Sequence, residues 1–417
     1  MSLRCLGEGK PEGFEIILRY RWLVLGAAWF SYFQASFHRV APAPILPTVT
    51  AELGISNALA GSLISAYFLS YVLLQIPAGQ AVDRYGPRPV IGPAILLLSL
   101  AALWFAFISS YAEGFAARIL IGVASGFIYV PAMRTVISWF PVTERGRGIG
   151  LYTSGGVTGA TIALASMPVL TLGFGWRTGY ALTTAMPFVA TVVAALVLKS
   201  TATDSAKPTI NSDPDVRSGG RPSLSAVFRN PYVVMSGVIN FTVFGSLIGL
   251  STWTYSYAVR ELGVEPVVAG LLPSAISLGA GVAQVLIGFV SDRLGRRKPF
   301  LVGGIVSASV CVALFGLTRS VPLAFVLAFL AGASVGVGVV MIFSIVSEQV
   351  EREQIGSAAA LTNMMASVGP VVTPYVGGIL LDVTGSFQNI FLFLSALLVI
   401  GSPLSLLEKE GMRPSSI

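Results

Sequence analysis

Charged and reactive residues are scarce in this chain. Asp, Glu, Lys and Arg make up 11% of its 417 residues, against about 25% in a typical soluble domain. Histidine occurs once, as His38, and cysteine twice, as Cys5 in a polar segment and Cys311 in an apolar run. This set is too small for a four-ligand metal site, and we expect no disulfide between the two cysteines. Because it also lacks a paired acid and base for catalysis, the sequence predicts no enzyme, metal or cofactor.

Hydrophobic residues, in contrast, make up 54% of the chain, and its mean hydropathy is +0.79. Apolar runs of about 20 residues, enough to cross a bilayer core as a helix, recur along most of the length. We predict an all-α polytopic membrane protein. The twelve predicted spans are 22–46, 58–80, 90–109, 113–139, 146–171, 178–198, 231–257, 267–290, 299–318, 322–349, 355–381 and 388–407.

A single long polar stretch, residues 199–230, divides these spans six and six. It is rich in Ser, Pro, Asp, Lys and Gly, which is typical of a flexible linker. The sequence therefore predicts an N-terminal six-helix bundle over residues 1–198, a cytoplasmic linker over 199–230 and a C-terminal six-helix bundle over 231–417.

The placement of basic residues predicts the orientation. The net charge is +7, but Lys and Arg are spread over short loops, with no basic face for nucleic acid. With the N-terminus in the cytoplasm, twenty basic residues fall on the inner side and only Arg177, Arg260 and Arg319 on the outer side. This bias is the positive-inside pattern of a multi-pass protein of the cytoplasmic membrane, with both termini inside. The N-terminus lacks the features of a cleaved signal peptide, so we expect the first helix to direct insertion.

The two halves of the chain repeat each other. Residues 60–88 align without a gap to 269–297, and twelve of the 29 positions are identical. The matched segments are the second span of each half and the charged loop after it. Parallel repeats related by an axis along the membrane normal are typical of secondary transporters.

Both copies of this loop resemble a motif of the major facilitator superfamily, Gly-x-x-x-Asp-Arg-x-Gly-Arg-Arg. The first copy departs from it at Pro87. The resemblance implies two pseudo-symmetric six-helix bundles around a central cavity, and a loop that acts as a conformational clamp between them. The clamp residues would be Gly79, Asp83, Arg84, Gly86 and Arg88 in one half and Gly288, Asp292, Arg293 and Gly295 in the other, where Arg296 and Arg297 follow. The alternative to a clamp is that each loop is only a tight turn whose basic residues follow the positive-inside pattern.

Ionisable residues inside the spans indicate where the substrate binds, because they are costly in lipid unless they face water or a partner. They are Arg39, Arg118, Arg134 and His38, with no acidic residue or lysine near the centre of any span. This positive bias favours an anionic substrate. Guanidinium pairs with two oxygens at once, and Arg39 resembles the arginine with which the superfamily's anion:cation symporters hold substrate. The alternative role of Arg39 is structural, on carbonyls freed by Pro42, Pro44 and Pro47.

The other three residues each have two interpretations. His38 lies where some of those symporters carry a proton-coupling acid, so it is the candidate for proton coupling; otherwise it packs helices. The departure from an acid at this position also leaves facilitated, uncoupled transport open. Arg118, with Gly122 and Gly126, matches a fourth-helix motif of the superfamily, which implies a structural bond rather than a ligand. Arg134 either extends to the inner interface or guards the inner mouth of the cavity.

Mid-span polar and aromatic residues complete the predicted binding site. They are Tyr32, Tyr67, Asn240, Trp253, Ser344 and Asn363, while the repeat-equivalent Gln75 and Gln284 are assigned a structural role. We expect a monomeric transporter that moves a small organic anion, a carboxylate, by alternating access, with Arg39 as the main anchor. The alternatives are an exporter of drugs or lipophilic cations, which usually has a buried acid, and a carrier of peptides or zwitterions.

Overall fold

The computed structural model describes residues 12–141, 144–197, 227–351 and 354–408, with side chains from residue 20 onward except that of Asp83. The predicted linker lies almost entirely outside these residues. The helices are α1 (Glu12–Val40), α2 (Leu46–Leu53), α3 (Asn57–Tyr85), α4 (Arg88–Ala106), α5 (Tyr111–Trp139), α6 (Arg145–Thr183), α7 (Ala185–Val197), α10 (Pro231–Arg260), α11 (Pro266–Leu294), α12 (Lys298–Leu317), α13 (Val321–Glu348), α14 (Ile355–Thr384) and α15 (Phe387–Leu407).

The helix α6 contains the fifth predicted membrane span and the start of the sixth, which continues into α7. At Gly175 the backbone has φ 75° and ψ 155°, which is not helical. A residue with a side chain would be strained at this positive φ, so the glycine allows the chain to reverse between two spans. These run over Arg145–Phe174 and Trp176–Val197, close to the predicted 146–171 and 178–198.

Eleven described helices are long and apolar enough to cross a membrane. The first predicted span is not among them, because α1 carries several polar residues, including the buried Gln34, Ser36 and His38. As a long helix packed against the others, it still forms the twelfth member of the assembly. The all-helical, twelve-span prediction is therefore confirmed.

Prolines end α1 before its predicted limit at residue 46. The helix stops at Val40, and after a turn the chain forms a short 3₁₀ helix, Ala43–Ile45, and then α2. Pro42 has no N–H group to donate to the carbonyl of His38, so the α-helical bonding pattern cannot continue through it. The predicted break at the end of this helix is confirmed.

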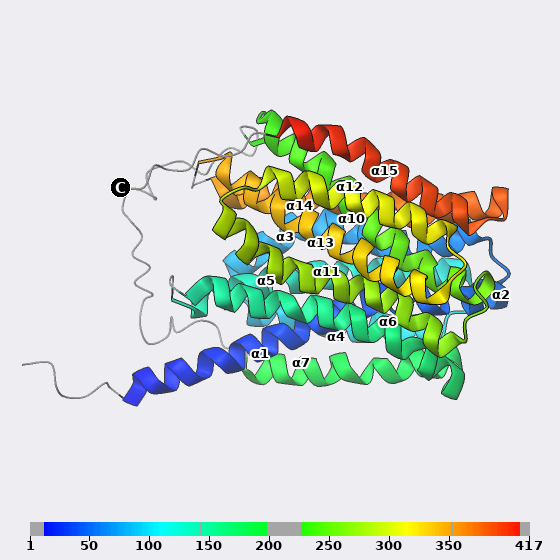
Figure 1. Ribbon diagram of the computed structural model, residues 1–417. Helices are drawn as coiled ribbons and strands as arrows, with labels where there is room; N and C mark the ends of the chain where they lie inside the picture. The colour runs from blue at the N-terminus through cyan, green and yellow to red at the C-terminus, as the bar shows by residue number, and fades with distance from the viewer. Residues whose placement is uncertain (1–11, 142–143, 198–226, 352–353, 409–417) are drawn as a thin grey trace, which may run out of the picture.

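The helices lie side by side with alternating direction, and both ends of the described chain lie on the left in Figure 1. We call this face, which carries the ends Tyr85, Leu294 and Glu348, the inner face, and the opposite face, with α2 and Thr384, the outer face. Buried apolar residues form two clusters. One is built almost wholly from α1–α7 and the other from residues 227 onward.

The two bundles meet mainly along two pairs of helices, α3 with α14 and α6 with α11. In the outer half these pairs approach very closely, because glycines replace larger side chains at the contact. A Cβ on Gly61 would strike the carbonyl of Pro374, and one on Gly270 would strike Pro168. Ser274 in α11 also donates a 3.1 Å hydrogen bond to the carbonyl of Thr161 in α6. The outer side of the bundle interface is therefore closed.

Candidate functional site

A cavity of about 210 Å³ lies between the two bundles. Its walls come from α1, α3 and α6 on one side and from α10, α11, α13 and α14 on the other. The polar residues in its lining are Tyr32, Arg39, Tyr71, Thr153, Asn240, Ser251, Ser277, Gln284, Asn363 and Ser367. Arg39 is the one charged residue among the described residues that line this central cavity.

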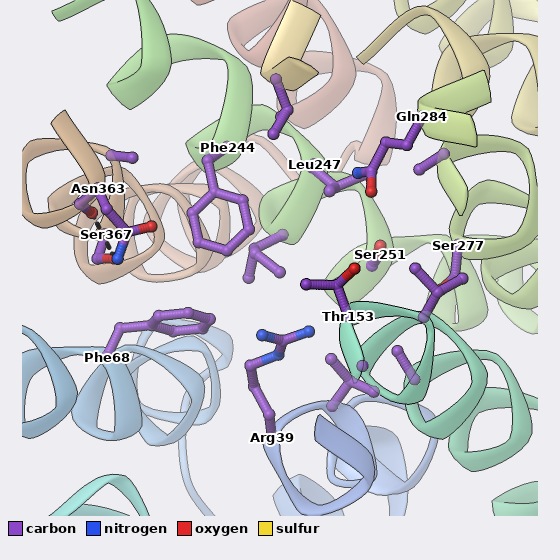
Figure 2. A pocket seen from close by; sticks show the side chains of 18 of the residues that line it. Arg39, Phe68, Thr153, Phe244, Leu247, Ser251, Ser277, Gln284, Asn363 and Ser367 are labelled. Carbon is purple, nitrogen blue, oxygen red and sulfur yellow. Dashed lines mark hydrogen bonds between the residues drawn. The ribbon is translucent and has the colours of Figure 1, made fainter. Parts of the chain in front are cut away.

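Arg39 extends from the last turn of α1 into the central cavity (Figure 2). Its Nη2 donates a 2.8 Å hydrogen bond to Ser36 Oγ, and that hydroxyl donates in turn to the carbonyl of Gly156 in α6 at 2.6 Å. Among the described residues no carboxylate pairs with Arg39, and its buried Nε has no hydrogen-bond partner. A cation that faces a cavity with unused donors is prepared for an anionic ligand.

Aromatic rings surround the base of Arg39. The ring of Tyr32 lies 4.8 Å from that of Tyr129 and 5.2 Å from that of Tyr152, measured between centroids. Tyr32 and Tyr71 both interact electrostatically with Arg39. Arg39 therefore lies beside a cluster of tyrosine rings from α1, α3, α5 and α6.

Two phenyl rings from different bundles meet across the central cavity. Phe68 in α3 and Phe244 in α10 have ring centroids 6.0 Å apart in an edge-to-face arrangement. Figure 2 shows both rings on the same side of Arg39, with Thr153, Ser251 and other polar side chains on the opposite side. The cavity therefore has one charged anchor, one aromatic pair and neutral polar side chains, of which Asn363 and Ser367 lie on the side of the rings.

Four residues of the predicted site lie outside this lining, and one of them, Arg134, lines a second cavity nearer the inner face. Tyr67 is 2% exposed and lies beneath the guanidinium of Arg118, whose Cζ is 5.1 Å from the ring centroid. Trp253, also 2% exposed, donates to the carbonyl of Pro374 within the C-terminal bundle. The hydroxyl of Ser344 donates to Val340 of its own helix. Tyr32, Arg39, Asn240 and Asn363 do line the cavity.

His38 faces the interior of the N-terminal bundle rather than the central cavity. Its side chain is fully buried, with Nδ1 3.1 Å from the carbonyl of Gln34 and Nε2 3.3 Å from Thr183 Oγ1. Adjacent helix residues point about 100° apart, so Arg39 can face the cavity only if His38 turns away from it. In this conformation His38 is not among the described residues that line the cavity.

Arg118 is fully buried and bonded to three backbone carbonyls. It donates to Leu63 at 2.9 Å, to His38 at 2.7 Å and to Arg39 at 2.9 Å. The last two carbonyls lie at the end of α1, where Pro42 interrupts helical bonding. Arg118 thus replaces the missing N–H groups and holds Arg39 in place. Nearby, a Cβ on Gly122 would overlap Ser70 and the carbonyl of Tyr67, so this glycine permits close packing of α5 on α3.

A second cavity, of about 510 Å³, lies nearer the inner face. Arg134 is part of its lining and donates a 3.0 Å hydrogen bond to the carbonyl of Gly79. Asn363 lines both cavities, and its Nδ2 donates to Gln75 Oε1 at 2.8 Å. This contact between α14 and α3 lies where the two cavities meet, so it narrows the passage toward the inner face. Arg134 therefore lines the cavity at the inner side of the protein.

The repeat-equivalent glutamines have different positions. Gln75 links the two bundles through Asn363 and, at 3.3 Å, Ser367. Gln284, for which the sequence predicts a structural role, instead lines the central cavity with its amide (Figure 2). Identical residues at equivalent positions in the repeat therefore need not share a role, because the two halves are packed against different neighbours.

The second loop motif forms an ion-pair network at the inner face. Arg297 contacts Asp292 at 2.8 Å and, from α13, Glu348 at 3.1 Å. Burial lowers the pKa of Arg297, but its hydrogen bonds to Glu348 and Asp292 outweigh this effect and raise the pKa above its ordinary value. Arg293 is exposed, so Arg297 is the arginine that connects α11 with α13.

In the first motif, the side chain of Asp83 lies outside the described residues, and Arg84 and Arg88 are exposed. Gly86 has φ 80° and ends α3, while Gly295, with φ 59°, ends α11. The turns that the sequence predicts at both loops are present. Gly288 faces open space, with nothing within 4 Å of a Cβ placed on it, so it makes no close helix contact here.

Several lining residues were not predicted from the sequence. They are mostly apolar or hydroxyl side chains: Phe68, Tyr71, Thr153, Phe244, Ser251, Ser277, Phe343 and Ser367. The repeat contained one usable signal, since Phe68 and Ser277 occupy equivalent positions and both face the cavity. No metal site was predicted, and none of the described residues group into a metal-binding cluster.

Comparison with known proteins yields relatives that cover most of the chain. The Probable galactarate/D-glucarate transporter GudP of Bacillus subtilis (strain 168) is 25% identical over 383 residues, covering 84% of this chain and 83% of the relative. The Hexuronate transporter of the same organism is 25% identical over 376 residues, covering 85% and 87%. Each of these two relatives thus covers more than four fifths of this chain.

A solved structure has the same fold. It is a bacterial homolog to the human lysosomal transporter Spinster in an inward-facing and unoccupied conformation, and it superimposes with a TM-score of 0.82 at 17% identity, covering 98% of this chain and 100% of that one. The sequence model of the Major Facilitator Superfamily matches residues 28–265 and 255–415. With its paired loop motifs, two helical bundles and central cavity, this chain belongs to the Major Facilitator Superfamily.

Proposed function

We propose that the protein is a secondary transporter that moves a small organic anion across the cytoplasmic membrane by alternating access. The central cavity would be its binding site and Arg39 the anchor for a carboxylate. The relatives named above are transporters of organic acids, which supports this class of substrate. The single observation that carries the proposal is that Arg39 is the one charged group among the described residues lining the cavity.

The unused donors of Arg39 support carboxylate binding. Bidentate pairing of a guanidinium with a carboxylate places two parallel N–H···O bonds between planar groups. Ser36 occupies Nη2 with one hydrogen bond, and Nε has no partner among the described residues. Arg118 bonds the carbonyl of Arg39, so the backbone from which the guanidinium extends is fixed before the ligand arrives.

The state of the bundle interface supports alternating access. The outer half is closed by the contacts of α3 with α14 and of α6 with α11. A second cavity continues from the central one toward the inner face, past Gln75 and Asn363. A substrate in this conformation would exchange with the inner side, where basic loop residues predict the cytoplasm. We propose that the monomer is sufficient for this cycle, because each bundle supplies one wall of the site.

The main alternative, export of lipophilic cations, lacks the group that would bind such a substrate. Among the described residues lining the central cavity there is no Asp or Glu. A cation would instead meet Arg39 in a medium of low dielectric constant, where like charges repel strongly.

Coupling to protons is a separate part of the proposal. The position of His38, bonded to Gln34 and near Thr183, supports a packing role more than a coupling role. The variant His38→Gln separates the two roles in proteoliposomes. If His38 carries the proton, accumulation driven by a pH gradient is lost while exchange of labelled for unlabelled substrate continues. If it only packs the helix, both activities change together or neither does.

Binding of anions by the purified protein tests the proposed function. Thermal unfolding would be recorded with D-glucuronate, D-galactonate, galactarate and a lipophilic cation in turn. A ligand present at 100 times its dissociation constant stabilises the folded state by about 2.7 kcal/mol. We expect stabilisation by at least one carboxylate, its loss in Arg39→Gln, and its retention in Arg260→Gln, which removes an exposed arginine at the end of α10. Stabilisation by the cation alone, or an unchanged response in Arg39→Gln, would contradict the proposal.

A further inference from the structure

We propose that the central cavity selects organic acids with one carboxylate over dianions of the same carbon skeleton. This selectivity rests on the proposed function, because it concerns the same site. The two named relatives do not decide the matter: hexuronates carry one carboxylate, whereas galactarate and glucarate carry two, and both relatives are 25% identical to this chain. The charges around the cavity favour an acid with one carboxylate.

One positive charge is available to a ligand in the central cavity. Arg39 supplies it, and the other described lining residues are neutral. Arg118 lies behind the wall and is fully buried, and it donates to the carbonyls of Leu63, His38 and Arg39. Its field strengthens the potential near Arg39, but it offers no second contact point.

Arg134 lies in the second cavity, nearer the inner face. It is bonded to the carbonyl of Gly79 on α3, and the contact between Gln75 and Asn363 stands where the two cavities meet. A small acid held by Arg39 therefore meets no other arginine among the described residues that line the central cavity. A second carboxylate would be buried without a counter-charge, which is strongly unfavourable.

The walls opposite Arg39 suit hydroxyl groups and C–H faces better than a carboxylate. Asn240, Ser277 and Gln284 can donate to or accept from a ligand hydroxyl, but they carry no charge. Phe68 and Phe244 present aromatic surface from both bundles. The face of an aromatic ring carries partial negative charge, so it packs favourably on C–H groups and repels an anion.

Binding of a matched pair of acids to the purified full-length protein tests the selectivity. D-galactonate and galactarate share one skeleton and differ at the terminal carbon, which is a hydroxymethyl group in the first and a carboxylate in the second. We expect galactonate to bind more than about tenfold more tightly, because the second carboxylate would be buried unpaired. Galactarate binding as tightly as galactonate, or more tightly, would overturn the inference.

Adding a cation on the neutral wall should reverse the preference. Gln284→Lys places an amine on α11, facing Arg39 across the central cavity, whereas Gln284→Leu removes the same amide without adding charge. We expect the lysine variant to gain affinity for galactarate relative to galactonate, and the leucine variant not to do so. If the lysine variant keeps the preference of the unmodified protein, charge does not set the selectivity and the inference fails.

The variant Arg39→Gln separates failure of this inference from failure of the proposed function. If the unmodified protein prefers galactarate and Arg39→Gln abolishes binding of both acids, the site is an anion site but the selectivity inference is wrong. If Arg39→Gln binds both acids as the unmodified protein does, the site itself is misplaced and the proposed function fails with it.

Discussion

Asp382 in α14 accepts two hydrogen bonds from Asn57 at the start of α3, one from the backbone N–H at 3.0 Å and one from Nδ2 at 2.8 Å. Its second carboxylate oxygen accepts from the backbone N–H of Ala58 at 2.8 Å. An acid from the C-terminal bundle thereby caps a helix of the N-terminal bundle. These bonds lie at the outer face and must break when the outer side opens.

Removing this cap should shift the protein toward its outward-open state. Loss of a helix cap costs about 1 kcal/mol, and because the bond exists only in the closed interface, Asp382→Ala should raise the open-to-closed ratio roughly fivefold. The distance between spin labels on the exposed residues Phe107 and Leu317, one in each bundle, measures this ratio. The control is Glu113→Ala, since Glu113 accepts from the backbone of Ser109 within its own bundle. Equal distance distributions in both variants would contradict the assignment.

Replacing Arg118 should destabilise the N-terminal bundle more than replacing an exposed arginine. Arg118→Met leaves three buried carbonyls without their donor, and we expect a loss of about 3 kcal/mol or more in the free energy of unfolding. Arg118→Lys should recover only part of it, since a single ammonium lacks the fork of donors that reaches several carbonyls. Thermal unfolding in detergent provides the measurement, with the exposed Arg145→Met as the control. A loss of stability no larger than that of the control would show that the three hydrogen bonds of Arg118 do not stabilise the fold.

Gly122→Ala should disturb the packing of α5 on α3. The new methyl group would overlap Ser70 and the carbonyl of Tyr67, and overpacking of this kind costs about 1–3 kcal/mol. Gly92→Ala serves as the matched control, because Gly92 also lies in a helix but has nothing within 4 Å of a Cβ placed on it. In thermal unfolding the first variant should lose stability while the second keeps or slightly gains it, as alanine favours helix over glycine. The opposite order would refute the close contact.

Glu408 should make stability depend on pH. It follows α15, is 1% exposed, and accepts hydrogen bonds from Ser236 at 2.6 Å and Gln349 at 2.7 Å. Burial raises its pKa above the ordinary 4.5. The folded state therefore holds the proton more tightly than the unfolded state, and stability should fall as pH rises from 4.5 through the raised pKa.

Glu408→Gln removes this titration. The side chain of the variant stays neutral at every pH. The unfolding temperature of the variant minus that of the unmodified protein should therefore increase as pH rises above 4.5, and this difference should become constant above the pKa of Glu408 in the folded state. Unfolding temperatures of both proteins across this pH range test the prediction. Parallel pH profiles would mean that the carboxyl group is not perturbed.

The approximate positions of the helices could be predicted from the apolar runs along the sequence. Each span must be apolar along about 20 residues to cross the bilayer, so the spans are visible in the sequence, and Pro42 and the glycines at the loop motifs mark where helices end. The repeat around Asp83 and Asp292 likewise indicates the family, because its charged residues interrupt two otherwise apolar stretches at equivalent places in the two halves.

The facing of side chains could not be predicted in the same way. In a soluble protein the polar face of a helix reveals its orientation, but a membrane helix is apolar toward both lipid and protein. Trp253 and Ser344 therefore looked as suitable for the cavity as Asn240 does. Arg39 and His38 are adjacent in the sequence, yet one faces the cavity and the other the bundle interior.

The helical class and the number of spans follow from the amino-acid sequence alone, because the bilayer requires long apolar runs. The two-fold repeat and the positive character of the interior follow from the sequence as well, because matching segments and charged residues are visible in it directly. Three features could be recognised only from the folded arrangement of the helices. Arg118 donates hydrogen bonds to the end of α1, Phe68 packs against Phe244, and Arg39 is the one charged residue among the described residues that line the central cavity. These features depend on the rotation of each helix about its axis, which is set by packing between bundles and leaves little trace in an apolar sequence.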